Sequence, residues 1–122
     1  MSDLEQLVDR YLATWNETDP AARRAAIAAV WAEGGSYVDP LMAATGHDAL
    51  DAMIAGVQAR FPGLEMRRAG AVDAHNDRVR FGWELGPAGA PGLVGGIDVA
   101  TLRDGRLASI TGFIDYAPAE AA

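Results

Sequence analysis

The sequence predicts an α+β domain: three N-terminal helices packed on a strongly curved, mostly antiparallel sheet, together forming a cone-shaped roll. Two observations lead to this prediction. Hydrophobic residues recur every three or four positions up to Phe61, which is typical of helices, and every second position from Leu64 onward, which is typical of strands. The length of 122 residues fits a single domain over residues 1–122, with a flexible tail expected over residues 117–122.

Capping residues and apolar stripes define the predicted helices. Ser2 and Glu5 have the spacing of a capping box, which satisfies free amides at a helix start. The apolar stripe of this first helix consists of Leu4, Leu7, Val8, Tyr11, Leu12 and Trp15. Start and stop residues bound the other two helices: Asp19-Pro20 and Gly34-Gly35 for the second, His47 or Asp48 and Pro62-Gly63 for the third.

Alternating apolar and polar residues predict five strands. These strands span residues 36–39, 64–74, 78–85, 93–102 and 106–116. Asn76-Asp77 is predicted to form a turn, and Asp104-Gly105 gives a strong hairpin signal because both of its positions tolerate positive φ. Loops are expected from Pro40 to Gly46 and, rich in Gly and Pro, over residues 87–92.

Composition and charge exclude several classes of partner. The chain is 50% hydrophobic and 22% charged, which is typical of a globular protein, and its net charge of −7 argues against nucleic acid and anionic membranes. Apolar runs are too short for a membrane-spanning helix, and the first five residues lack a signal-peptide pattern. We therefore expect a cytoplasmic protein with no nucleic-acid or membrane partner.

Metal and cofactor chemistry is not expected from the motifs present. The chain has no cysteine, and its two histidines, His47 and His75, have no second ligand at metal-binding spacing. A nucleophile elbow, a phosphate-binding loop and a dinucleotide fingerprint are also missing from the sequence. We expect no metal and no cofactor.

The last strands carry apolar residues on both faces. Leu107 and Phe113 have one parity, whereas Ile110 and Ile114 have the other. If helices cover one face of the sheet, a partner must cover the other, which predicts a homodimer through the sheet.

Asp98 is the most informative polar residue. It lies in a strand where both alternating rows are mainly apolar, so no register places it in a polar row. A buried carboxylate is costly, and burial raises its pKa unless a cation or several donors reach it. The ordinary alternative is a carboxylate bonded to backbone amides or lying at a strand edge, and we favour a functional role.

Two further polar residues have ordinary interpretations when taken alone. Asp39 ends a strand before Pro40, as in a common Asp-Pro turn, and shares a face with Tyr37. Tyr11 lies on the buried stripe of the first helix, where a core tyrosine bonded to a backbone carbonyl is the usual case.

Large apolar side chains predict a pocket at the open end of the cone. Most such residues belong to the core, but a bent sheet with helices on one side leaves an opening. The predicted pocket residues are Trp15, Tyr37, Met53, Phe61, Trp83 and Phe113.

The order of elements over about residues 4–116 resembles the nuclear transport factor two-like superfamily, which includes the SnoaL-like proteins. The resemblance rests on residues 11–16 (YLATWN), 37–40 (YVDP), 46–50 (GHDAL), 96–98 (GID) and 104–106 (DGR). It implies the cone-shaped fold, but the superfamily holds enzymes, binding modules and dimerisation domains.

Ketosteroid isomerase is the most similar enzyme of this superfamily in its chemical residues. The resemblance places its helix-one tyrosine on Tyr11, its aspartate before a proline on Asp39 and its late-strand aspartate on Asp98. It implies that ionised Asp39 is the base and that a protonated Asp98 forms the oxyanion hole with Tyr11. Isomerisation next to a carbonyl needs such a base and such donors.

Two features depart from that enzyme, and other hypotheses stay open. The second helix looks about one turn longer, and the loop over residues 86–92 is unlike a compact hairpin. The similar limonene epoxide hydrolase is disfavoured, because Gly112 stands where that enzyme has a catalytic aspartate. A SnoaL-like polyketide cyclase would place its key aspartate near Asp98. The remaining alternatives are a pocket that only binds a hydrophobic small molecule and a dimerisation domain with a filled cone.

Overall fold

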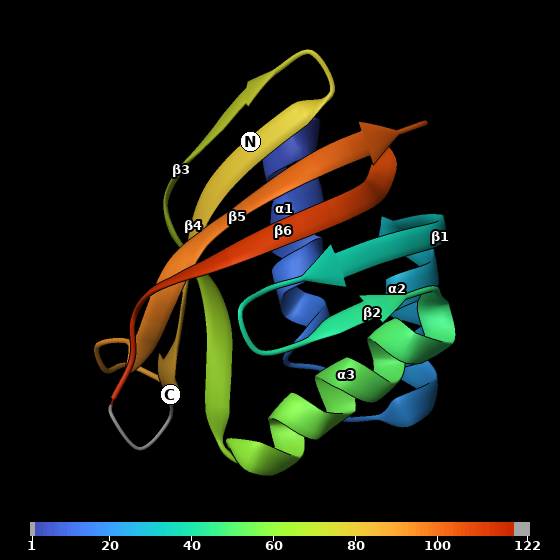
Figure 1. The fold of residues 1–122 in the computed structure, drawn as a ribbon. Helices are drawn as coiled ribbons and strands as arrows, with labels where there is room; N and C mark the ends of the chain where they lie inside the picture. The colour runs from blue at the N-terminus through green and yellow to red at the C-terminus, as the bar shows by residue number, and fades with distance from the viewer. Residues whose placement is uncertain (1, 119–122) are drawn as a thin grey trace.

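The computed structural model describes residues 2–118, which form three helices and a six-stranded sheet (Figure 1). The predicted α+β class is therefore confirmed. The elements, in chain order, are α1 (Asp3–Thr14), α2 (Pro20–Val30), β1 (Trp31–Val38), β2 (Ala43–Thr45), α3 (His47–Arg60), β3 (Leu64–His75), β4 (Arg78–Pro87), β5 (Val94–Arg103) and β6 (Arg106–Tyr116).

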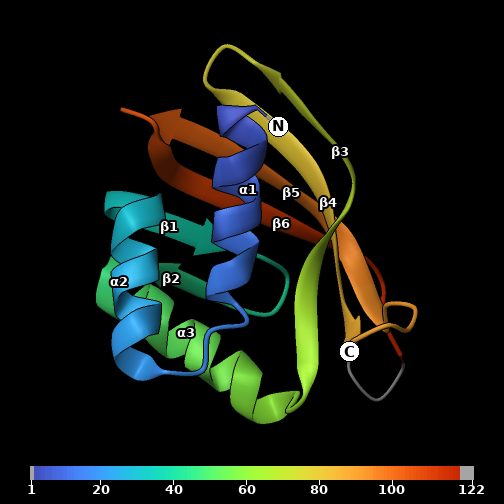
Figure 2. The same ribbon diagram turned by 180° about the vertical axis from the view of Figure 1, so that it is seen from behind.

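The sheet is curved and mostly antiparallel, as predicted. Its strand order is β2-β1-β6-β5-β4-β3, and β1 pairs with β6 in parallel while the other neighbours are antiparallel. All three helices lie on one side of the sheet, which Figure 2 shows from the helical side. The opposite face of the sheet is turned toward the viewer in Figure 1 and carries no helix.

Helix α1 follows its sequence signals closely. The Ser2 side chain accepts a hydrogen bond from the Glu5 amide, and the Glu5 carboxylate reaches back to the Ser2 amide, completing the predicted capping box. The apolar stripe packs on the sheet, with Val8 and Tyr11 each only 1% exposed. This helix therefore carries Tyr11 into the interior.

Helix α2 is shorter than predicted, because it ends at Val30 and not at Gly34-Gly35. Trp31 is extended and begins β1, where it pairs with Leu107 of β6. The two glycines serve the strand instead: Gly34 has φ +73°, and a Cβ on Gly35 would lie 2.7 Å from the Trp31 ring. They accompany a register shift between Trp31 and Ser36. The extra helical turn expected from the sequence is thus absent.

Two loops also differ from expectation. The segment expected as a loop before Gly46 contains the short strand β2, whose Ala44 pairs with Tyr37 of β1. Strand β4 runs on to Pro87, so it takes up the start of the Gly/Pro loop. Asp104 and Gly105 adopt φ +52° and +78°, as the hairpin prediction requires, and Asn76 in the predicted turn before β4 also has φ +52°.

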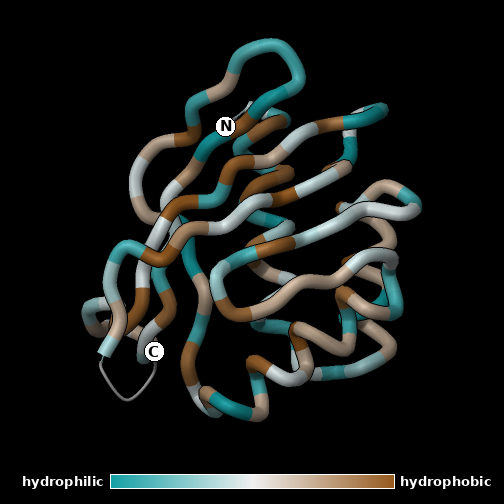
Figure 3. Tube along the Cα trace, viewed as in Figure 1, coloured by the Kyte–Doolittle hydropathy of each residue, from teal (hydrophilic) through white to brown (hydrophobic). Residues whose placement is uncertain are grey.

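The core lies between the helices and the inner face of the sheet. Hydrophobic and less hydrophobic segments alternate along the strands, and hydrophilic residues gather in the β3–β4 turn (Figure 3). Leu107 and Ile110 both face this core, because a register shift between Thr101 and Leu102 of β5 changes the parity of β6. The expectation that Leu107 shares a face with Phe113 is therefore wrong.

Two expectations concern regions at the limits of the described chain. Of the tail predicted over residues 117–122, only Ala117 and Pro118 are described, and residues 119–122 lie outside the description. Within residues 2–118, no helix combines the length and apolar character needed to cross a membrane.

Candidate functional site

A cavity of about 810 Å³ lies between the helices and the curved sheet. Five of the predicted pocket residues line it: Trp15, Tyr37, Met53, Phe61 and Trp83. Phe113 does not, since it is 53% exposed on the outer face of β6, and this prediction is wrong. Ile114 lines the cavity in its place, because Ile114 pairs with Gly96 on the inner face.

The structure brings Tyr11, Asp39 and Asp98 to this cavity from three separate elements. Tyr11 comes from α1, Asp98 from the middle of β5, and Asp39 from the residue just after β1. Asp98 pairs with Gly112 of β6, and the end of β1 runs in parallel beside the same part of β6. The three candidate residues are therefore neighbours in space although 87 positions separate Tyr11 from Asp98.

Gly112 lies between the two carboxyl groups. A Cβ added there would lie 3.0 Å from Oδ1 of Asp98, 3.1 Å from Oη of Tyr37 and 3.2 Å from Cβ of Asp39. Only a residue without a side chain leaves these groups so close to the strand. In the sequence, Gly112 was notable only as a missing aspartate, although a glycine inside a strand is itself a signal of close approach.

Asp98 is held in a largely apolar environment and is 3% exposed. The hydroxyl of Tyr11 donates to its Oδ2 at 3.2 Å, and Oδ1 has no hydrogen-bond partner within residues 2–118. Burial raises the pKa of Asp98 to about 7, against the hydrogen bond from Tyr11, and the charge of Asp39 also raises it. Near neutral pH, this carboxyl group can therefore be either an acid or a base.

Tyr11 is a buried hydrogen-bond donor. Its ring has edge contacts with Trp15, Trp31 and Phe81 at centroid distances of 6.5, 6.0 and 5.9 Å. Burial, followed by the charge of Asp98, raises the pKa of Tyr11 well above its ordinary value, so the hydroxyl keeps its proton. This hydroxyl bonds to a carboxylate, and not to a backbone carbonyl as in the ordinary interpretation.

Asp39 combines its ordinary role with a place in the cavity. Its Oδ1 accepts hydrogen bonds from the backbone amides of Leu41 and Met42 at 2.8 and 3.0 Å, which closes the turn around Pro40. Its Oδ2 accepts from the hydroxyl of Tyr37 at 2.7 Å. Burial raises the pKa of Tyr37, so this hydroxyl remains a donor. The sequence showed that the two residues share a face, but not their contact.

A metal site finds no support in the part of the chain that the structure describes. No group of three or more His, Asp or Glu side chains there could hold an ion. The expectation that the protein uses no metal and no cofactor stays a prediction.

Comparisons with known proteins place this geometry in a family context. The SnoaL-like domain family matches residues 8–110. A candidate isomerase of the SnoaL-like family from Agrobacterium tumefaciens is 38% identical, with a TM-score of 0.88 over 95% of this chain and 100% of that one.

Two more distant structures show the same fold. A candidate SnoaL-like polyketide cyclase from Jannaschia is 23% identical, with a TM-score of 0.67 over 91% of this chain and 86% of that one. A candidate ketosteroid isomerase from Kribbella flavida is 18% identical, with a TM-score of 0.69 over 95% and 80% of the two chains. No curated protein matches the chain.

Proposed function

The chain belongs to the SnoaL-like domain family, and on this premise we propose that it is an acid–base enzyme acting on an enolisable carbonyl compound. The reaction is a double-bond isomerisation of the ketosteroid isomerase type. One observation carries the proposal: Asp98, a carboxyl group with a pKa of about 7, is buried beside the donor Tyr11 and close to a second carboxyl group, Asp39. Two carboxyl groups in different environments suit the separate roles of base and acid.

In this mechanism Asp39 is the base. It takes a proton from the carbon next to the carbonyl, the C–H electron pair forms a new double bond, and the carbonyl oxygen becomes an enolate oxygen. Tyr11 and neutral Asp98 donate hydrogen bonds to that oxygen as its charge develops. Asp39 then returns the proton to the far carbon, which completes the shift of the double bond.

The cavity favours a mainly apolar ligand. Its volume of about 810 Å³ is within the usual range for small-molecule sites, roughly 300–1,000 Å³. Aromatic and methionine side chains form much of its wall, and Asp39 and Asp98 supply the polar groups. A hydrophobic molecule with a carbonyl group placed between the two aspartates fits this arrangement.

A second candidate function makes Asp98 the base, as in a SnoaL-like polyketide cyclase. Both oxygens of Asp39 already accept hydrogen bonds, which weakens Asp39 as a base, whereas Oδ1 of Asp98 has no partner in the described chain. A pKa of about 7 also suits a base at neutral pH. Cyclisation through an enolate would use the same cavity and the same donor, Tyr11.

An absorbance assay with a β,γ-unsaturated ketosteroid separates these functions, because conjugation of the double bond gives the signal. If Asp39 is the base, Asp39→Asn abolishes turnover, while Tyr11→Phe lowers kcat about 10²–10³-fold. Asp73→Asn, a change at an exposed aspartate, is the matched control and keeps full activity. Loss in Asp98→Asn with activity retained in Asp39→Asn would instead make Asp98 the base. A folded wild-type protein without turnover would contradict the isomerase assignment.

The remaining expectations are also proposals. Binding without catalysis would give ligand stabilisation that survives Asp39→Asn and no turnover. A homodimer through the sheet would cover Phe113 and Tyr116, which are 53% and 49% exposed on the outer face of β6. Light scattering of the wild type and of Phe113→Glu tests it: a dimer that becomes a monomer is expected. A cytoplasmic location stays a prediction.

A further inference from the structure

Three buried polar atoms of residues that line the cavity lack partners in the described chain: Nε1 of Trp15, Nε1 of Trp83 and Oδ1 of Asp98. The last two are complementary neighbours on the sheet. Nε1 of Trp83 is a donor without an acceptor, and Oδ1 of Asp98 is an acceptor without a donor. Both residues are more than nine-tenths buried, with exposures of 8% and 3%. Native proteins leave few buried polar groups unpaired, so each of these two atoms needs an explanation.

The strand register places the two side chains on the same face. Trp83 of β4 pairs with Gly96 of β5, and Asp98 follows Gly96 by two residues. Trp83 and Asp98 are thus diagonal neighbours on the inner face, within reach for a long aromatic side chain. A Cβ on Gly96 would lie 3.0 Å from Cζ2 of Trp83, so the N–H edge of the indole ring lies over this glycine.

Of the two unpartnered indoles at the cavity, Trp15 lies edge-on to the ring of Tyr11, whereas Trp83 is the neighbour of Asp98 on the sheet. Tyr11 of α1 already bonds Oδ2, and the hydroxyl of Tyr37 is taken by Asp39 at the end of β1. Strand β6 presents Gly112, which has no side chain. The indole of Trp83 is close enough to the Asp98 carboxyl to lower its pKa, against the larger effect of burial.

We propose that Trp83 is a positioning residue whose indole N–H donates to Oδ1 of Asp98. When Asp98 is neutral, its Oδ1 accepts from Trp83, and the acidic proton therefore resides on Oδ2, beside Tyr11. The consequence for catalysis rests on the proposed isomerase function. With Trp83 bound to Oδ1, the acidic proton on Oδ2 and the Tyr11 hydroxyl both point toward the same substrate oxygen.

An NMR titration of the ligand-free protein tests the contact directly. The three indole N–H signals belong to Trp15, Trp31 and Trp83, and single Trp→Phe variants assign them. The Trp83 signal should move with the same midpoint as the carboxyl carbon of Asp98, and Asp98→Asn should abolish this movement. Trp31, a buried tryptophan away from the cavity lining, is the internal reference and should stay constant. A constant Trp83 signal while Asp98 titrates would overturn the proposal.

A substitution series gives a second, independent readout. Trp83→Phe should raise the pKa of Asp98 by about one pH unit, because a donor to the charged form is lost. Phe113→Leu, a change on the outer face of β6 away from the cavity lining, is the control and should leave that pKa unchanged. Replacing Trp83 by 3-benzothienylalanine keeps the ring shape without the N–H and should repeat the rise; an unchanged pKa would contradict the contact. Neither experiment uses turnover, so the contact can fail or hold independently of the isomerase proposal.

Discussion

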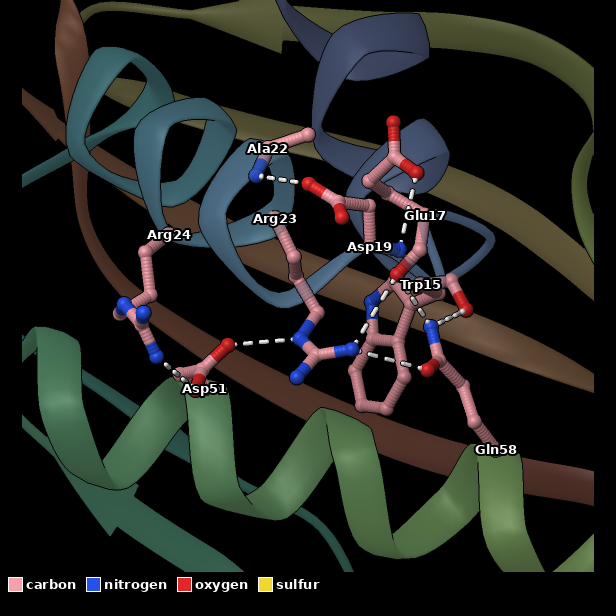
Figure 4. A network of polar contacts seen from close by, with 8 residues as sticks. All are labelled: Trp15, Glu17, Asp19, Ala22, Arg23, Arg24, Asp51 and Gln58. Atoms are coloured by element: carbon pink, nitrogen blue, oxygen red, sulfur yellow. Dashed lines mark hydrogen bonds and ion pairs between the residues drawn. The ribbon is translucent and has the colours of Figure 1, made fainter.

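Two regions of this molecule bury charged side chains, and they do so in opposite ways. Arg23 of α2 is 5% exposed and donates to Asp51 at 2.6 Å, to Gln58 at 3.0 Å and to the carbonyl of Glu17 at 3.3 Å (Figure 4). Asp98 is buried to a similar degree, but it has one hydrogen bond, from Tyr11, and no cation within reach in residues 2–118.

The difference separates a structural site from a reactive one. In the Arg23 cluster, Gln58 also donates to the carbonyls of Trp15 and Glu17, so the cluster ties α3 to α2 and to the end of α1. All of these contacts are made within the protein, so the role of this ion pair is to hold the helices together. Asp98 has no such ion pair in the described chain, and its isolation in an apolar environment raises its pKa. A raised pKa is the property that an acid–base group needs.

Breaking the saturated cluster gives the largest expected effect. Arg23→Ala should lower the free energy of unfolding by about 3–5 kcal/mol, because Asp51, whose side chain is only 14% exposed, loses its main partner. Arg24→Ala is the matched control: Arg24 is 58% exposed and 3.9 Å from Asp51, so its loss should cost less than about 1 kcal/mol. Urea denaturation at pH 7 measures both, and equal losses would contradict the comparison.

Removing the charge of Asp98 should increase the free energy of unfolding at high pH, whereas removing Arg23 should lower it. Its pKa is about 7 in the folded protein against an ordinary 3.8, so the native state binds more protons between these pH values. The wild type therefore loses unfolding free energy as pH rises through that window, by up to roughly 4 kcal/mol. Asp98→Asn should be more stable than wild type at pH 8 and lose this advantage at pH 4. Thermal melts at both pH values test it; a pH-independent difference would contradict the account.

Substitutions at Gly56 test whether the ligand binds in the cavity. It lies inside α3 at the cavity wall, and a Cβ there would meet no atom within 4 Å in the described chain. Gly56→Ala should stabilise the protein by about 1 kcal/mol, because glycine is a poor helix former. Gly56→Leu should fill part of the cavity and raise the KM for the ketosteroid without unfolding the protein. An unchanged KM for Gly56→Leu would place the ligand elsewhere.

An exposed ion pair should give the smallest effect. Arg80 and Asp73 are 2.9 Å apart, with side chains 61% and 66% exposed. Solvent screens such a pair, so Arg80→Ala should change the free energy of unfolding by less than about 1 kcal/mol. A loss as large as that of Arg23→Ala, measured under the same conditions, would mean that burial does not decide the strength of these pairs.

Local chemistry was enough to predict much of the fold. The capping box of α1 and the two tight hairpin turns depend on neighbouring residues alone, and each formed as the sequence indicated. The end of α2 and the strand β2 could not be predicted in this way. They depend on the pairing of β1 with β6 and with β2, which residues distant in sequence supply.

The residues of the candidate site also divide into those that the sequence identified and those that depend on strand pairing. Asp98 was identified from the sequence because a carboxylate in an apolar row is costly wherever the strand lies. Tyr11 and Asp39 came from the family resemblance. The positions of Gly112 and Trp83 beside Asp98 follow only from the strand register. The error at Phe113 has the same origin, because one register shift reverses which residues of β6 face the cavity.

The most direct test of this account is a ¹³C NMR titration of the Asp98 carboxyl group in the ligand-free protein, assigned with Asp98→Asn. Burial in the cavity should place the midpoint at about pH 7, far above the ordinary aspartate pKa of 3.8. A midpoint near pH 4 would mean that Asp98 is solvated or paired like an ordinary aspartate. The distinction between a saturated structural charge and a reactive one would then fail.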